Sequence, residues 1–152
     1  MTTVKPSKKL NLRHSLKKPF FNSRLNLSPL VAGMIAASLI GTYLDLFFVG
    51  NGIYFFPNRP FPTIFNINVA FTLLGLPVIT LVTLYFLSSM SKMERRTFIV
   101  FLSLIFCFAE NISENFGWFK HSESWEHFYS FIGYIIFFSV IWRIYNMFKS
   151  GQ

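Results

Sequence analysis

Four long apolar runs, separated by short polar segments, set the pattern of this chain. Each run is close to the roughly 20 residues that a tilted helix needs to cross a bilayer. The expected spans are residues 30–49, 64–87, 97–119 and 128–148. They predict an all-α, polytopic membrane protein whose four-transmembrane-helix bundle occupies residues 30–148, after a basic flexible cytoplasmic arm at 1–29 and before a short cytoplasmic tail at 149–152.

The composition agrees with the membrane class. The 152 residues are 53% hydrophobic and only 13% charged, and the mean hydropathy is +0.47, which is too apolar for an ordinary soluble domain. The 21 phenylalanines fit a surface that faces lipid. The net charge of +8 does not indicate nucleic-acid binding, because the basic residues precede the first run or flank the later ones.

The placement of these basic residues predicts the orientation. All but two of the 14 Lys and Arg residues fall on one predicted face: Lys5, Lys8, Lys9, Arg13, Lys17, Lys18, Arg24, Lys92, Arg95, Arg96, Arg143 and Lys149. The opposite loops carry only Arg59 and Lys120, so the positive-inside rule puts both termini in the cytoplasm. The arm contains no acidic residue and is expected to touch anionic lipid headgroups.

Three acidic residues, Asp45, Glu110 and Glu114, lie inside the apolar runs. A carboxylate near the bilayer centre costs roughly 2.5 kcal/mol or more, so each must be protonated, paired or turned toward a polar cavity. In the third run a helical projection puts polar and small residues on one inward stripe. The stripe is Ser103, Cys107, Glu110, Glu114, Gly117 and His121. The opposite, lipid-facing side is Phe101, Ile105, Phe108, Ile112 and Phe119.

These positions predict a polar cluster in the outer half of the bundle. Its expected members are Asp45, Arg59, Asn66, Asn68, Glu110, Asn111, Glu114, His121 and His127. One interpretation is structural, with the three acids bonded to Asn66, Asn68 and Arg59 so that they fasten the helices together. A second is proton or cation handling by Asp45, Glu110 and Glu114, because two carboxylates one turn apart cannot easily both be ionised.

Two further interpretations stay open but have weaker support. Metal binding by Glu110, Glu114, His121 and His127, with Asp45 as a further candidate, needs these ligands to converge in space, and their spacing is not a recognised motif. Catalysis is disfavoured because the chain has no serine elbow, P-loop, HExxH or CxxC, and no cofactor is predicted. The sequence thus favours a noncatalytic membrane or accessory protein, with a proton- or cation-handling transporter or sensor as the alternative.

Two features concern helix packing. Gly33, Ala37 and Gly41 recur every four residues in the first span, a spacing that lets two backbones approach closely. This row is a candidate surface for self-association or for a membrane-protein partner. Pro77 predicts a kink in the second span, because it removes a backbone hydrogen bond and clashes with the preceding turn.

The segments GTYLDLFFVGNGIYFFPNRPFPTIFNINVAFTLL at 41–74 and HSESWEHFYSFIGY at 121–134 resemble a family of small, uncharacterised multi-pass membrane proteins from spore-forming Gram-positive bacteria. The resemblance implies a location in the bacterial plasma membrane. It names no activity, ligand or partner, so no functional residue is carried over from it.

Overall fold

The computed structural model describes residues 27–123 and 125–151. Within them lie four helical segments that are long and apolar enough to cross a membrane. These are α1 (Leu27–Gly50), a π-helical turn η1 (Phe71–Gly75) that continues into α2 (Leu76–Ser89), α3 (Lys92–Asn115) and α4 (His127–Ser150). The predicted all-helical class with four such helices is confirmed. Most of the predicted basic arm, with all seven of its Lys and Arg residues from Lys5 to Arg24, lies outside the described residues.

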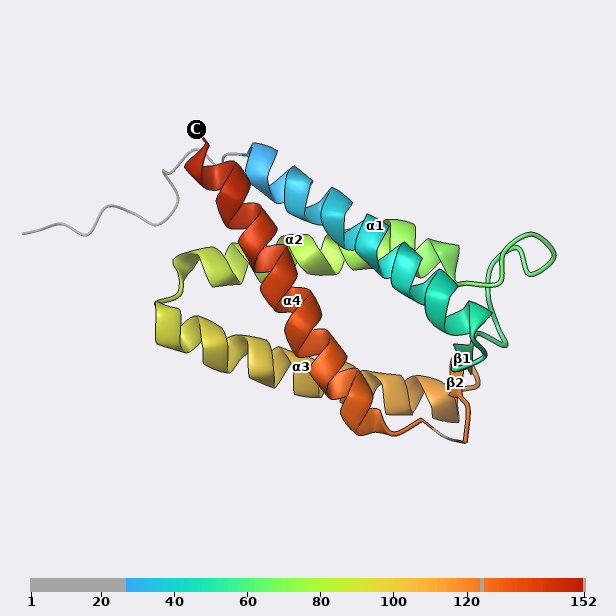
Figure 1. Ribbon diagram of the computed structural model, residues 1–152. Coiled ribbons are helices and arrows are strands. Elements are labelled where there is room, and N and C mark those ends of the chain that lie inside the picture. The colour runs from blue at the N-terminus through green and yellow to red at the C-terminus, as the bar shows by residue number, and fades with distance from the viewer. Residues whose placement is uncertain (1–26, 124, 152) are drawn as a thin grey trace, which may run out of the picture.

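Two loops meet at one end of the molecule, which we call the loop end. The first loop is residues 51–68 and the second is residues 116–126. Each contributes a two-residue strand, β1 (Tyr54–Phe55) and β2 (Lys120–His121), and the two strands pair antiparallel. The opposite end, which we call the turn end, holds the α2–α3 turn and the end of α4 (Figure 1). Lys92, Arg95 and Arg96 at the start of α3 therefore lie at the turn end.

The helices do not all contact one another equally. α1 packs against both α2 and α4, and α4 packs against α3 along its other side. Figure 1 shows α4 crossing the molecule diagonally from the end of α3 to the start of α1. One buried cluster joins α1, α2 and α4: Leu30, Ala37, Leu76, Leu84, Ile141 and Tyr145. A second, made by Leu87, Ile99 and Phe138, joins α2, α3 and α4.

The row of small residues on α1 packs against α2 of the same chain. Gly33 and Ala37 are buried, and a Cβ atom added to Gly33 would collide with Leu84. A Cβ atom added to Gly41 would collide with Leu76 in the same way. The close approach that the spacing predicts is therefore used within the chain, and the row is not a free surface for another copy or partner.

The second span begins later than predicted, at Phe71 rather than residue 64, and its first turn is a π-helix. In this turn each carbonyl accepts from the N–H five residues later, as the Phe71 carbonyl does from the Leu76 N–H. By the same pattern the Thr72 carbonyl would accept from the backbone N–H of residue 77. That residue is Pro77, which has no N–H to donate. Ser38 on α1 donates its hydroxyl to the Thr72 carbonyl at 2.8 Å instead, so the irregular turn is satisfied from a neighbouring helix.

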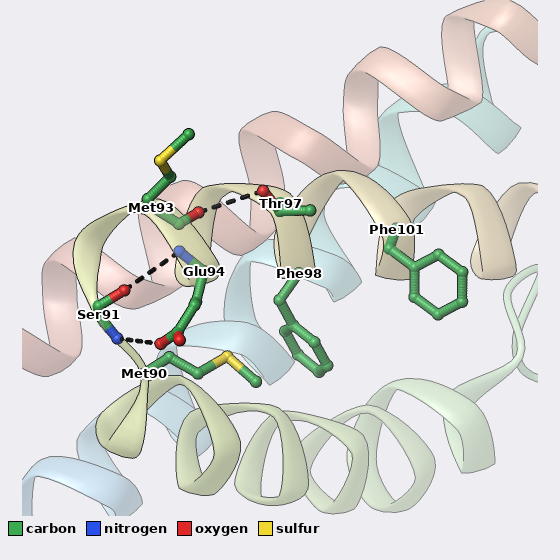
Figure 2. A pocket seen from close by; sticks show the side chains of 7 residues that line it. All are labelled: Met90, Ser91, Met93, Glu94, Thr97, Phe98 and Phe101. Atoms are coloured by element: carbon green, nitrogen blue, oxygen red, sulfur yellow. Dashed lines mark hydrogen bonds between the residues drawn. The ribbon is translucent and has the colours of Figure 1, made fainter.

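The third span starts earlier than predicted, at Lys92 rather than residue 97, because Ser91 and Glu94 form a capping box (Figure 2). Glu94 Oε2 accepts from the Ser91 N–H at 2.8 Å. Beside it, the Arg95 guanidinium donates to the carbonyls of Leu87 and Met90 and lies 4.0 Å from the ring centroid of Trp142. A single cation thus caps the end of α2 and ties the α2–α3 turn to α4.

Candidate functional site

The position of the candidate site depends on where α3 ends, because the chain after Asn115 folds back beside the helix. The Gly117 N–H bonds to the Glu114 carbonyl at 2.9 Å and the Trp118 N–H bonds to the Ser113 carbonyl at 3.0 Å. Gly117 has φ +69°, so these are the two bonds of a Schellman motif with glycine in the left-handed position. The predicted stripe is therefore correct on α3 from Ser103 to Glu114. It is wrong beyond Asn115, because the helix stops there and Gly117 and His121 lie in the second loop.

The first loop holds the second loop folded back over the end of α3. Tyr54 pairs with His121 in the ladder, and the Ser122 N–H donates to the Ile53 carbonyl at 2.8 Å. Asn58 adds a side-chain bond to the Gly117 carbonyl at 3.1 Å. These contacts return His121 to the side of α3 that carries the two glutamates, although His121 is not on the helix.

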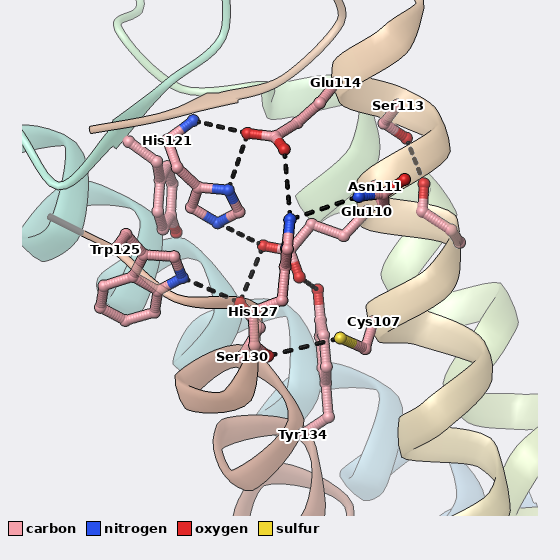
Figure 3. A network of polar contacts seen from close by, with 12 residues as sticks. Cys107, Glu110, Asn111, Ser113, Glu114, His121, Trp125, His127, Ser130 and Tyr134 are labelled. Carbon is pink, nitrogen blue, oxygen red and sulfur yellow. Dashed lines mark hydrogen bonds and ion pairs between the residues drawn. The ribbon is translucent and has the colours of Figure 1, made fainter. Parts of the chain in front are cut away.

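His121 lies between the carboxylates of Glu110 and Glu114 (Figure 3). Its Nε2 atom is 2.7 Å from Glu110 Oε1, and its Nδ1 atom is 2.8 Å from Glu114 Oε1. The Glu114 oxygen also accepts the backbone N–H of His121 at 2.8 Å. The His121 and Glu110 side chains are only 6% and 8% exposed, whereas that of Glu114 is 25% exposed. The arrangement is one imidazole held by two carboxylates at the rim of the helix bundle.

Glu110 is fixed by hydroxyl groups of α4. Ser130 donates to Glu110 Oε1 at 2.9 Å, and Tyr134 donates to Glu110 Oε2 at 3.3 Å. Trp125 in the second loop donates its indole N–H to the Ser130 hydroxyl oxygen at 3.0 Å. Both oxygens of this nearly buried carboxylate therefore have partners, which is what a carboxylate in an apolar helix requires.

His127 is the first residue of α4, and its side chain lies beside Glu114. Its Nε2 atom lies 3.6 Å from Glu114 Oε2 and 3.3 Å from the Asn111 side-chain nitrogen. Its backbone carbonyl accepts the Cys107 thiol at 3.3 Å. The His127 side chain is 41% exposed, so the group is reached from outside the bundle on this side. We call Glu110, Glu114, His121 and His127 the carboxylate–histidine cluster.

Aromatic rings cover His121. The Trp125 ring stacks on the imidazole at 5.8 Å between centroids with an interplanar angle of 12°, and the Phe119 ring meets it edge-on at 4.5 Å. Phe119, which the sequence pattern placed on the lipid side, instead packs against Tyr54 and His121. Burial lowers the pKa of His121, but the hydrogen bonds and charges of Glu110 and Glu114 outweigh it and raise that pKa above its usual value.

Asp45 lies outside the carboxylate–histidine cluster. Its Oδ1 atom accepts the Tyr54 hydroxyl at 2.5 Å, and its Oδ2 atom has no hydrogen-bond partner among the described residues. Burial, and then the Asp45 charge, raise the pKa of Tyr54, so the tyrosine is the donor. The Tyr54 ring in turn packs edge-on against His121 at 6.2 Å, so Asp45 adjoins the cluster through one side chain.

The predicted bonds from Arg59, Asn66 and Asn68 to the acids are not formed. Arg59 donates to three carbonyls of its own loop, those of Phe56, Pro62 and Phe65. Asn68 Oδ1 accepts the Phe71 N–H at 3.2 Å at the start of the second span, and Asn66 is exposed. The reason is that the residues around them form the first loop, where unpaired backbone groups attract these side chains more directly than the acids do.

Sequence reasoning brought Glu110, Asn111, Glu114, His121 and His127 into one group, and the structure also does so. It missed Tyr54, Trp125, Ser130 and Tyr134, which supply the other hydrogen bonds. A signal existed for Ser130 and Tyr134, because two hydroxyl groups four residues apart lie on one helix face.

Comparisons with protein-family models, with curated proteins and with solved structures give no match for this chain. Glu114, His121 and His127 each offer a ligand atom, and these atoms all lie within 4.8 Å of one another. Such a group can fasten the two loops to α3 and α4, and it can bind a cation.

Proposed function

We propose that this protein is a noncatalytic, multi-pass membrane protein in which the carboxylate–histidine cluster binds a cation and thereby fastens the loop end to α3 and α4. It acts as a cation-responsive sensor or as an accessory protein of the membrane. The observation that supports this most directly is the position of His121 between the carboxylates of Glu110 and Glu114.

A purely structural role, in which the cluster only holds the loops against α3 and α4, does not explain why its residues are ionisable. A neutral amide would join two helices with less desolvation cost than a carboxylate. Here two carboxylates face two imidazoles, and the partly exposed side chains of Glu114 and His127 form the accessible edge. An accessible edge with a buried, fully bonded carboxylate behind it suits a site that exchanges a cation with water.

A sensor or accessory role is favoured over transport by the distribution of acidic residues. The chain has six acidic residues, and Glu94 is the one at the turn end, where its carboxylate is used in the capping box of α3. Glu123 and Glu126 lie in the second loop, and Asp45 is bonded to Tyr54 near the loop end. These positions offer no series of carboxylates along which a cation would cross the bundle.

The proposal includes a location in the bacterial plasma membrane, with both termini in the cytoplasm and the loop end outside. Lys92, Arg95 and Arg96, like Arg143 and Lys149 near the end of α4, belong to the turn end, whereas Arg59 and Lys120 belong to the loop end. This asymmetry supports the assignment through the positive-inside rule. The partners expected are the bilayer itself, anionic headgroups at the N-terminal arm, and a second copy or a membrane protein that binds elsewhere than on the row of Gly33, Ala37 and Gly41, which α2 covers.

The test is whether cations stabilise the protein through this cluster. Purified protein in detergent micelles is unfolded by heat with and without K⁺, Mg²⁺, Ca²⁺, Mn²⁺ or Zn²⁺. A cation at about 100 times its Kd should stabilise the wild type by about 2.7 kcal/mol. The double variant Glu110→Gln with Glu114→Gln should lose this response, whereas Glu123→Gln, a control in the exposed part of the second loop, should keep it. The proposal fails if no cation stabilises the wild type, or if the double variant responds equally.

A further inference from the structure

We infer that the cation of this cluster is a divalent first-row transition ion of the Zn²⁺ type, bound by Glu114, His121 and His127 and positioned by Glu110. This inference rests on the proposed function, because it names the class of cation that the same cluster takes.

The ligand atoms are already close enough for small movements to complete a site. Those of Glu114, His121 and His127 all lie within 4.8 Å of one another, and the pairs that Glu114 makes with the two imidazoles measure 2.8 and 3.6 Å. Metal bonds of about 2.0–2.2 Å in a tetrahedral arrangement put ligand atoms about 3.4 Å apart. His127 is the most exposed of the three, so its ring has room for the remaining shift.

The ligand types select the class of ion. Two imidazoles with one carboxylate suit Zn²⁺ and neighbouring transition ions, whereas Ca²⁺ and Mg²⁺ prefer sites made only of oxygen atoms. The cluster offers two nitrogen ligands and one carboxylate. K⁺ and Ca²⁺ are therefore expected to bind far more weakly than Zn²⁺.

Glu110 provides the support that metal-binding histidines usually have. In metal sites the second ring nitrogen of a ligand histidine commonly donates to a carboxylate, which fixes the tautomer and the ring orientation. Glu110 Oε1 lies 2.7 Å from His121 Nε2, and Ser130 and Tyr134 hold this carboxylate in place. When His121 is protonated on both ring nitrogens, binding of the ion between Nδ1 and Glu114 Oε1 releases the Nδ1 proton to water, and the proton left on Nε2 lies beside Glu110.

The charges and the surroundings favour a doubly charged ion. Two carboxylates together neutralise a divalent cation, which reduces the cost of placing charge at the edge of an apolar helix bundle. Trp125 and Phe119 shield one side of His121, and the exposed edge at His127 leaves a way in from water. The ion enters from the loop end and reaches three ligands that come from α3, β2 and α4.

The experiment uses full-length protein without a histidine tag, stripped by a chelator and kept in detergent micelles at pH 8. Zn²⁺ binding is measured by calorimetry, and Co²⁺ is followed by its visible absorption. We expect one ion per chain, and bands typical of tetrahedral Co²⁺. Affinity should fall by roughly 10–100-fold in Glu110→Gln, as for other supporting carboxylates. It should fall further in Glu114→Gln and His127→Gln, and stay unchanged in Glu123→Gln.

His127→Gln is the decisive variant, because the His127 side chain is partly exposed and its polar partners are Asn111 and Glu114, so its loss should leave the fold intact. Circular dichroism and unfolding temperature check this. Wild-type affinity for Zn²⁺ in His127→Gln would overturn the ligand assignment. Stabilisation by K⁺, Mg²⁺ or Ca²⁺ without binding of Zn²⁺ or Co²⁺ would overturn this inference and leave the proposed function standing. A protein that responds to no cation would overturn both.

Discussion

At the residue scale, the three acids of the apolar helices, Asp45, Glu110 and Glu114, are satisfied in two different ways. Glu110 and Glu114 share His121, whereas the Tyr54 hydroxyl is the one hydrogen-bond donor to Asp45 among the described residues. The sequence could reveal that all three acids need partners, because charge in an apolar span is costly. It could not reveal which partners they take. Tyr54 and Tyr134 resemble the apolar residues around them, and their hydroxyl groups matter only once the loops and α4 are in place.

Replacing His121 by Phe should lower the free energy of unfolding by about 2 to 3 kcal/mol. The substitution keeps an aromatic ring against Trp125 but leaves the two glutamates facing each other without a donor between them. The loss should be below the 3–5 kcal/mol typical of a fully buried pair, because Glu114 is 25% exposed. Chemical unfolding in micelles measures it, with Lys120→Gln, at an exposed position of the same strand, as the control. Equal effects of the two variants would contradict the role given to His121.

Tyr54 and Asp45 should prove energetically coupled. Tyr54→Phe removes the donor to Asp45 Oδ1, and leaving a buried acceptor unpaired costs about 1–3 kcal/mol. In an Asp45→Asn background the same change should cost less, because a neutral amide tolerates an apolar surrounding better than a carboxylate does. A double-mutant cycle of unfolding free energies measures the coupling. Strictly additive effects would show that the bond has no role in stability.

At the element scale, helical periodicity predicts correctly which residues share a face of α3, but it fails for the residues after Asn115, where the helix has ended. A projection at 100° per residue correctly puts Ser103, Cys107, Glu110 and Glu114 on one face. It assumes that the helix continues, so it also assigns to that face residues that lie in the second loop. Gly117 was the available signal, because glycine in the left-handed position is the commonest stop. The exposed side of α3 was predicted well, since Phe101 and Phe108 are 58% and 68% exposed and the buried Ser103 lies opposite.

The contact of α1 with α2 gives a prediction at this scale. Gly33→Val should lower the free energy of unfolding by about 1–3 kcal/mol, because the added side chain overlaps Leu84, which is fully buried and has little room to move. Gly133→Val is the matched control, since a Cβ atom added to Gly133 on α4 meets nothing within 4 Å. That variant should stay within about 0.5 kcal/mol of the wild type. If Gly133→Val proved as damaging as Gly33→Val, close packing on α2 would not be the cause.

At the scale of the whole molecule, four helices and two unequal ends were readable from the sequence. Apolar length and the positions of Lys and Arg suffice for that. The order of contacts was not readable, because apolar faces of similar composition do not specify which helix meets which. Thus the spacing of Gly33, Ala37 and Gly41 makes this row a candidate surface for another chain, whereas α2 of the same chain covers it.

Orientation is testable by labelling single cysteines in a Cys107→Ala background. Glu123→Cys lies at the loop end and Met93→Cys at the turn end, and both native side chains are exposed. A membrane-impermeant maleimide should label position 123 in intact cells and position 93 only after permeabilisation, because the basic residues gather at the turn end. The reverse result would invert the proposed topology, and labelling of both positions in intact cells would contradict a sealed, spanning bundle.

The pairing of Tyr54 with His121, and the bonds from Ser130 and Tyr134 to Glu110, have a consequence for biogenesis. A nascent chain emerges N-terminus first, so α3 is synthesised before the hydroxyl groups that satisfy its glutamate. Until α4 follows, that helix carries two acids with no donors from α4 and is a poor candidate for release into lipid. In the proposed membrane topology the last two helices should therefore leave the translocon as a pair, whereas the ladder between the loops can close once β2, which precedes α4, has emerged.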